Sequence, residues 1–475
     1  MKRVITFSLL AALLCMPAFA QEVNKAAKKE AVKSHLKQHF KPYGFIRNYF
    51  TYDSRESWSG TADLYNYQPK DQKLNEYGDD LNAQSTFRFL SLTTRLGLNI
   101  TGYKWRNTEF SGKIEADFYA GLSTKTSSVD SKIKETHAVS GVAQFRLRQA
   151  YLALGWDSLP MLGGKDFARV DLTIGQTWHP MAADLCDAIA LNSGAPFGPF
   201  NRSPMVKMDA RLGKYFTLTA AGLWQMQYLS IGPGNLQSAE YMLYGKTPEA
   251  YLGISIHDKG WLFRAGADVL SISPRHLGTV ADAALGKDVT VKVNDRITTA
   301  SPFVYLQYKK GEFSFKGKTI FAESGEHMNM YGGYGVKKVN ADGSYEYTPI
   351  RHSTTWISLV YGGKVGAQED KHPQKLQGIL FAGYVQNFGT KEALATKSDG
   401  SLYGFYNPRS NAMNRMWRMS PTLLYTVGKF QLGLEYEITS VQYGDGKINA
   451  ANGLSENGLH WVTNHRVQLM TKYNF

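Results

Sequence analysis

The sequence predicts a transmembrane antiparallel β-barrel of about 16 strands, and three observations lead to this prediction. Segments in which apolar and polar residues alternate recur from Tyr43 to Phe475, which is the pattern of strands with one apolar face. After residue 20 no apolar run approaches the roughly 20 residues that a membrane-spanning helix needs. The chain also begins with an export signal and is rich in tyrosine and glycine, with 28 and 45 residues.

The first 20 residues have the layout of a secretory signal peptide. Lys2 and Arg3 precede an apolar stretch at residues 4–16, and Ala18-Phe19-Ala20 has the small-x-small pattern of a cleavage site. We expect cleavage near Ala20 and delivery of the mature chain to the bacterial outer membrane.

Residues 21–42 form a lysine-rich segment before the first predicted strand, and several of them favour a helix. The segment is expected to be a solvated leader or a short helix.

The predicted barrel domain covers residues 43–475. Its connections alternate between tight turns and long loops, as in barrels with short periplasmic turns and longer extracellular loops. An even number of strands would place both chain ends on the periplasmic side. The predicted strands are 43–52, 88–102, 108–122, 144–156, 169–178, 205–212, 215–227, 249–258, 261–272, 300–309, 312–324, 353–362, 376–389, 414–427, 430–442 and 460–475.

A soluble β-sandwich is the alternative fold, and the composition of single strands argues against it. In strand 312–324, Phe313 and Phe315 alternate with Lys316 and Lys318. Strand 430–442 repeats the pattern with glutamates on its polar face. A barrel with a wet interior satisfies both faces, because the apolar one meets lipid and the charged one meets water.

The inward faces are predicted to be basic. Without Lys2 and Arg3 the mature chain has 52 Lys and Arg against 40 Asp and Glu, a net charge near +12. A basic lumen lowers the barrier for anions and raises it for cations. The alternative is that many of these cations pair with acidic residues and leave a weakly selective pore. The basic residues expected to line the pore are Arg47, Arg95, Arg146, Arg148, Lys207, Arg211, Lys316, Lys318, Arg418 and Arg466.

The connection 179–204 is the predicted constriction loop. Its many small and apolar residues must pack on a surface, and the lumen wall is the nearest one. Asp184, Asp187 and Arg202 belong to this loop, and the acids would face basic wall residues and create a transverse field. The alternatives are a loop above the barrel or at a subunit contact. Cys186 is expected to be a small packed residue.

The inward and outward faces are hardest to assign in strands 43–52 and 144–156. Arg146 and Arg148 share a face with Leu152 and other apolar residues, so a β-bulge near Ala150 would be needed to switch the register. A subunit contact through the neighbouring Gln149 is the other interpretation.

Two motifs, FRLRQAY and IGQTW, lie between Phe145 and Pro180. This region resembles the DcaP-like and related trimeric porins of Gram-negative outer membranes. The resemblance implies sixteen-stranded trimers whose constriction is narrowed by inward loops, lined by basic residues and permeable to small anions such as dicarboxylates. The resemblance also implies that Arg146 and Arg148, which lie in the FRLRQAY motif, are the first candidates for basic residues of the constriction. The chain departs from DcaP in its N-terminal segment, which is too short for a long coiled coil.

The expected function is passive diffusion of small hydrophilic solutes, preferably anions such as organic acids. The expected surroundings are outer-membrane lipid and lipopolysaccharide, in a homotrimer, with no nucleic-acid partner. No cofactor, metal site or enzymatic activity is predicted: there is no G-x-S-x-G motif, and the pair His35 and His39 lacks a third ligand. The alternatives are an adhesive or structural barrel with tyrosine-rich loops in 328–349, and a hydrophobic-substrate channel in which residues 21–42 form a hatch.

Overall fold

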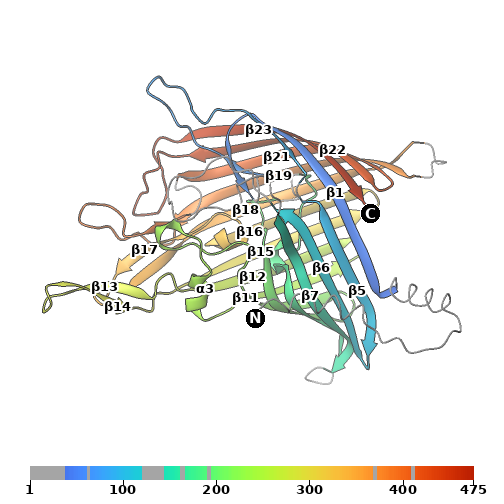
Figure 1. The fold of residues 1–475 in the computed structure, drawn as a ribbon, viewed down its shortest axis with the longest axis horizontal. Coiled ribbons are helices and arrows are strands. Elements are labelled where there is room, and N and C mark those ends of the chain that lie inside the picture. The colour runs from blue at the N-terminus through green and yellow to red at the C-terminus, as the bar shows by residue number, and fades with distance from the viewer. Residues whose placement is uncertain are drawn as a thin grey trace, which may run out of the picture.

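In the computed structural model, 16 antiparallel strands of the described residues close into a barrel (Figure 1). The prediction of fold class and strand number is therefore confirmed. The signal peptide and most of segment 21–42 lie outside the described part of the chain. The structure describes residues 38–60, 65–91, 93–119, 144–160, 166–189, 194–366, 372–407 and 412–475.

Each barrel strand pairs with its neighbours in sequence, and β23 closes the barrel on β1, with Phe45 opposite Asn474 and Asp53 opposite Arg466. The barrel strands are β1 (Phe40–Asp53), β5 (Arg95–Trp105), β6 (Thr108–Tyr119), β7 (Gln144–Pro160), β8 (Asp166–Trp178), β9 (Arg202–Leu212), β10 (Phe216–Leu223), β11 (Glu249–Asp258), β12 (Trp261–Ile272), β15 (Ile297–Lys310), β16 (Phe313–Glu323), β18 (Tyr345–Val365), β19 (Gln374–Thr390), β21 (Met413–Val427), β22 (Phe430–Tyr443) and β23 (His460–Asn474).

Shorter elements lie in the connections between the barrel strands. Among the described residues, no helix is long and apolar enough to cross a membrane. The short strands are β2 (Ser57–Gly60), β3 (Tyr65–Pro69), β4 (Thr86–Leu90), β13 (Leu277–Asp282), β14 (Lys287–Lys292), β17 (Tyr334–Val339) and β20 (Phe405–Tyr406). The helices are η1 (Pro180–Ala182), η2 (Pro233–Asn235), α3 (Glu240–Gly245) and η3 (Gly325–Met328).

The predicted strand 88–102 is divided in the structure into β4 and β5, which is a correction. β4 pairs with the second half of β1, and β5 pairs with its first half. Between them Thr93 has a φ of 72°, a left-handed conformation that ends the strand. The Thr93 hydroxyl then accepts hydrogen bonds from the Arg47 guanidinium, at 3.1 Å from Nε and 2.8 Å from Nη2.

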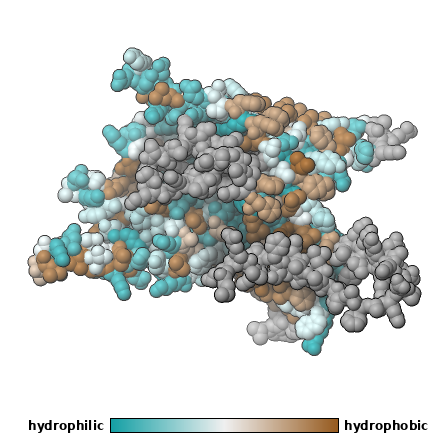
Figure 2. Space-filling view, viewed as in Figure 1, coloured by the Kyte–Doolittle hydropathy of each residue, from teal (hydrophilic) through white to brown (hydrophobic). Residues whose placement is uncertain are grey.

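The barrel has an apolar outer face and a polar inner face. Along β22, Leu432, Leu434 and Tyr436 are exposed, whereas Glu435 and Glu437, which alternate with them, are buried. Figure 2 shows brown, hydrophobic side chains gathered at the upper right, over strands β21 to β23 as Figure 1 labels them. This alternation places apolar side chains where lipid would contact the barrel.

The register between β6 and β7 contains the bulge that the sequence left as an alternative. Gln149 lies opposite Glu115 and Leu147 lies opposite Ala116, so Arg148 is the extra residue. Phe145 and Leu147 are exposed on the outer face before the bulge, and Leu152 is exposed after it. The extra residue Arg148 therefore reverses the alternation of inward and outward side chains. Apolar side chains consequently point outward both before and after the bulge.

Candidate pore constriction

The loop between β8 and β9 leaves the barrel wall and returns to it at one narrow neck. At that neck the His179 backbone N–H donates a hydrogen bond to the Asn201 carbonyl oxygen at 3.1 Å. The loop side chains between these residues contact strands on the other side of the barrel, so the segment lies across the interior.

The two loop acids contact basic side chains of the wall. Asp187 accepts a hydrogen bond from Lys316 Nζ at 2.8 Å. Asp184 forms an ion pair with Arg264 and lies 3.7 Å from Lys318 Nζ, which also donates to the Met181 carbonyl oxygen. The acids therefore face basic wall residues at contact distance and neutralise part of the positive charge of the wall.

The far part of the loop reaches β19, β21 and β22. The Ile189 N–H donates to Glu435 at 2.7 Å, and Arg418 Nη1 donates to the Ala195 carbonyl oxygen at 3.2 Å. The ring of Phe197, which is fully buried, lies over Gly383 of β19 so closely that an added Cβ atom there would meet it at 2.6 Å. Gly383 is needed at this position because the aromatic ring occupies the space of a side chain.

Two further connections fold into the interior, and the sequence analysis missed both. Strand β3 is buried along its length, and the Asn66 carbonyl oxygen accepts a hydrogen bond from Arg418 Nη2 at 2.7 Å. Residues 325–331 are also buried, and the Phe200 N–H donates to the Met328 carbonyl oxygen at 2.9 Å. The tyrosine-rich run 328–335, considered for an adhesive surface, is thus part of the barrel filling.

Cys186 lies within the constriction loop and is 3% exposed. Burial raises the pKa of its thiol to about 12, because a thiolate would lose its hydration there. We predict that the folded barrel resists thiol-specific methanethiosulfonate reagents at pH 8, whereas the urea-unfolded chain reacts with one equivalent. Mass spectrometry measures both reactions, and rapid labelling of the folded protein would contradict the buried position.

On the wall formed by β1, β5, β6, β7 and β23, basic side chains gather around few acids. Phe45 has three cations over its ring, with Arg47, Arg95 and Lys472 at 5.0, 4.9 and 4.6 Å from the ring centroid. The basic cluster, as we name it, consists of Arg47, Arg95, Lys113, Arg146, Arg148, Arg202 and Lys472.

Two carboxylates lie among these seven cations. Glu115 accepts a hydrogen bond from Arg148 at 2.9 Å, and Asp117 pairs with Arg146 at 2.9 Å and with Arg148 at 2.6 Å. Arg202 stacks over Trp178 at 4.9 Å from its ring centroid and continues the cluster to the neck of the loop. The cluster therefore keeps an excess of positive charge after its ion pairs are formed.

The remaining basic residues predicted to line the pore have different surroundings. Lys207 pairs with Asp209 at 2.6 Å, and Arg211 is exposed near the turn that follows β9. Arg466 is 1% exposed and pairs with Asp53 at 2.8 Å. Lys318 and Arg418 are buried beneath the inward segments. These three covered side chains hold the interior together, and open water does not surround their charges. Arg47, Arg148 and Arg202 of the basic cluster are buried as well, whereas its other four members are partly exposed.

A closed barrel with an apolar outer face, a charged inner face and an inward loop defines the class: this is an outer-membrane β-barrel with the fold of a porin. The solved structure of the outer-membrane channel DcaP of Acinetobacter baumannii has the same fold. It is 17% identical to this chain, the match covers 92% of this chain and 97% of DcaP, and the TM-score is 0.59. At this identity the likeness shows the fold alone.

Two further solved structures match over similar lengths. OmpT of Vibrio cholerae is 10% identical, with 92% of this chain and 97% of that chain covered and a TM-score of 0.45. An anion-selective porin from Comamonas acidovorans is 11% identical, with 92% and 99% covered and a TM-score of 0.44. No protein-family model matches the sequence. No curated protein sequence matches it either.

Proposed function

We propose that this chain is an outer-membrane porin for passive diffusion of small hydrophilic solutes, and that it prefers anions such as organic acids. The observation that carries the proposal is the basic cluster, in which seven cations lie with two carboxylates on the inner wall. A surplus of fixed positive charge beside a narrow aqueous path attracts anions and repels cations. The constriction loop supports the proposal, because its acids are already paired with other cations and leave this surplus in place.

The test is a measurement of reversal potential with purified protein in planar lipid bilayers. In a tenfold gradient of KCl, the reversal potential should have the sign of the chloride equilibrium potential. Potassium acetate and potassium succinate in place of KCl should keep that sign. A cation-selective current would reject the anion preference, and bilayers that stay silent at high protein concentration would reject the porin itself.

An adhesive barrel is the second candidate that the sequence left open. Its candidate surface was the tyrosine-rich loops in 328–349, but in the first of the two runs, 328–335, Met328, Met330 and Tyr331 are buried against the inward segments. Aromatic side chains in this position narrow a passage and are not presented to another cell. The burial of this run therefore favours a channel.

We further propose that the mature chain begins after cleavage near Ala20 and assembles as a homotrimer. The outer face of β5 to β8 supports this, because it contains a groove of about 510 Å³ lined by Ile100, Ile114, Leu152 and Ile174. Gly112 lines this groove without a side chain, so that a second copy can approach its backbone. Native mass spectrometry of the detergent-solubilised protein should give the trimer mass, and a monomer alone would contradict the assembly.

A further inference from the structure

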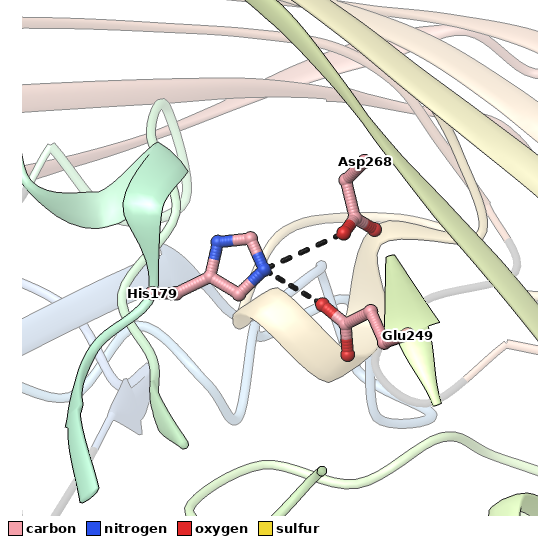
Figure 3. Close-up of side chains that lie close together, drawn as sticks. All are labelled: His179, Glu249 and Asp268. Atoms are coloured by element: carbon pink, nitrogen blue, oxygen red, sulfur yellow. Dashed lines mark hydrogen bonds and ion pairs between the residues drawn. The ribbon is translucent and has the colours of Figure 1, made fainter. Parts of the chain in front are cut away.

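Four titratable side chains from separate parts of the chain meet at the neck of the constriction loop. His179 follows β8, Glu249 begins β11, Asp268 belongs to β12, and His327 belongs to η3. Each of them is at most 1% exposed. Figure 3 shows the His179 ring directed at the carboxyl groups of Glu249 and Asp268, whose ligand atoms lie within 4.8 Å of one another.

The hydrogen bonds of His179 determine where its proton lies. Its Nδ1 accepts a hydrogen bond from the Met181 backbone N–H at 3.1 Å, so Nδ1 carries a lone pair. The proton of the neutral ring is then on Nε2, which donates to Glu249 Oε1 at 2.7 Å. His179 therefore orients Glu249 and has no free nitrogen for a metal ion.

His327 has the opposite tautomer. Its Nδ1 lies 3.1 Å from the Ser324 carbonyl oxygen, which can only accept, so Nδ1 carries the proton. In the neutral ring Nε2 then presents its lone pair, and it lies 3.6 Å from Glu249 Oε1 and 3.6 Å from Asp268 Oδ2. Among the described residues, His327 Nε2, Glu249 Oε2 and Asp268 Oδ1 are buried atoms without a hydrogen-bond partner. Each of these three side chains thus keeps one buried polar atom that a further ligand could satisfy.

Two carboxylates buried in a dry interior need positive charge beside them. Among the described residues, Glu249 and Asp268 form ion pairs only with these two imidazoles. A divalent cation would balance the charge. His327 Nε2 lies 3.6 Å from one oxygen of each carboxylate. This is close to about 3.3 Å, the distance between two ligand atoms in a tetrahedral site whose metal–ligand bonds are near 2.0 Å.

We propose that His327 Nε2, Glu249 and Asp268 bind a divalent cation, with Zn²⁺ the best match, and that His179 acts from outside the ligand set by holding Glu249. One imidazole nitrogen with two carboxylates suits Zn²⁺, whereas Ca²⁺ and Mg²⁺ prefer oxygen ligands throughout. The positioning role of His179 corresponds to the hydrogen bonds that orient metal ligands in known sites.

Such an ion would fasten the constriction loop to the wall. His327 and its neighbour Met328 already contact the end of the loop, because Asn201 Nδ2 donates to the His327 carbonyl oxygen at 2.8 Å and the Phe200 N–H donates to Met328. Glu249 and Asp268 belong to adjacent wall strands. The cation would therefore join two inward segments and the barrel at one point.

The experiment is X-ray diffraction from the full-length mature protein, refolded with and without Zn²⁺ and measured above and below the zinc absorption edge. The expected result is one anomalous peak between His327, Glu249 and Asp268. Absence of that peak from protein refolded in saturating Zn²⁺ would overturn the proposal. That result is also the one expected if a proton on His327 takes the place of the cation.

Binding measurements on variants provide an independent test. His327→Gln and Glu249→Gln should each weaken Zn²⁺ binding by at least about 100-fold, and His179→Leu by about 10-fold to 100-fold. His276→Gln is the matched control, because His276 is exposed and lies outside the cluster. Heat-modifiable mobility in gels checks that each barrel is folded. Unchanged affinity in folded His327→Gln protein would overturn the ligand assignment, and the diffraction experiment decides the question if a variant does not fold.

Discussion

Replacing Arg47, Arg95 and Lys472 together by glutamine should lower the anion-to-cation permeability ratio about fivefold in 0.1 M salt. If a permeating ion passes roughly 10 Å from the three side chains in water, their charges change its energy by about 1.2 kcal/mol. Screening over one Debye length leaves about a third of this energy. The change acts with opposite sign on anions and cations, so the ratio responds to twice that energy. Reversal potentials in a KCl gradient measure it.

The dependence of the permeability ratio on salt concentration provides a second test of the same prediction. In 1 M salt the Debye length falls to about 3 Å, and the difference between variant and unaltered protein should nearly vanish. The matched control changes Lys214, Lys310 and Lys429 to glutamine, because these exposed lysines lie at or beside tight turns and carry the same total charge. An equal shift in the control would mean that net charge, and not the basic cluster, determines selectivity.

Replacing residues 183–198 by Gly-Ser-Gly should widen the path and increase single-channel conductance about twofold or more. A short bridge can join the ends because His179 and Asn201 are already hydrogen-bonded to one another at the neck. Anion preference should rise at the same time, since Arg264, Lys316 and Lys318 lose their acidic partners Asp184 and Asp187. Single-channel recordings give both quantities.

The control for this excision keeps the loop and removes only its charges. Asp184→Asn with Asp187→Asn should raise the anion preference while conductance changes little, because the loop still fills the same space. If excision of the loop leaves the conductance unaltered, the narrowest part of the path lies elsewhere, for example at the buried segment 325–331.

The strands could be predicted because the relevant signal is local. Lys316 and Lys318 alternate with phenylalanines within one strand, and that alternation fixes both the strand and its two faces. The bulge at Arg148 was also foreseeable, because without it Arg146 would share a face with Leu152. Local alternation therefore predicted the barrel wall.

The interior could not be predicted in the same way. Arg418 is covered by residues 66 and 195, and His179 meets Glu249, which lies 70 positions further along the chain. Whether a charged wall residue meets water or a returning loop depends on such distant contacts, which no single strand encodes. The tyrosines of β3 and the methionines near His327 were the only local signal that these connections are buried.

The seam between the first and last strands also constrains how the barrel forms. Residues 45–53 pair with residues 466–474, and Gly44 exchanges two backbone hydrogen bonds with Phe475. These contacts have nearly the largest sequence separation that the chain allows, so loop closure delays them most. The open sheet must therefore persist, with both edges unpaired, until β23 has been delivered. A chaperone or an assembly factor that covers those two edges would act on the slowest and most aggregation-prone stage of folding.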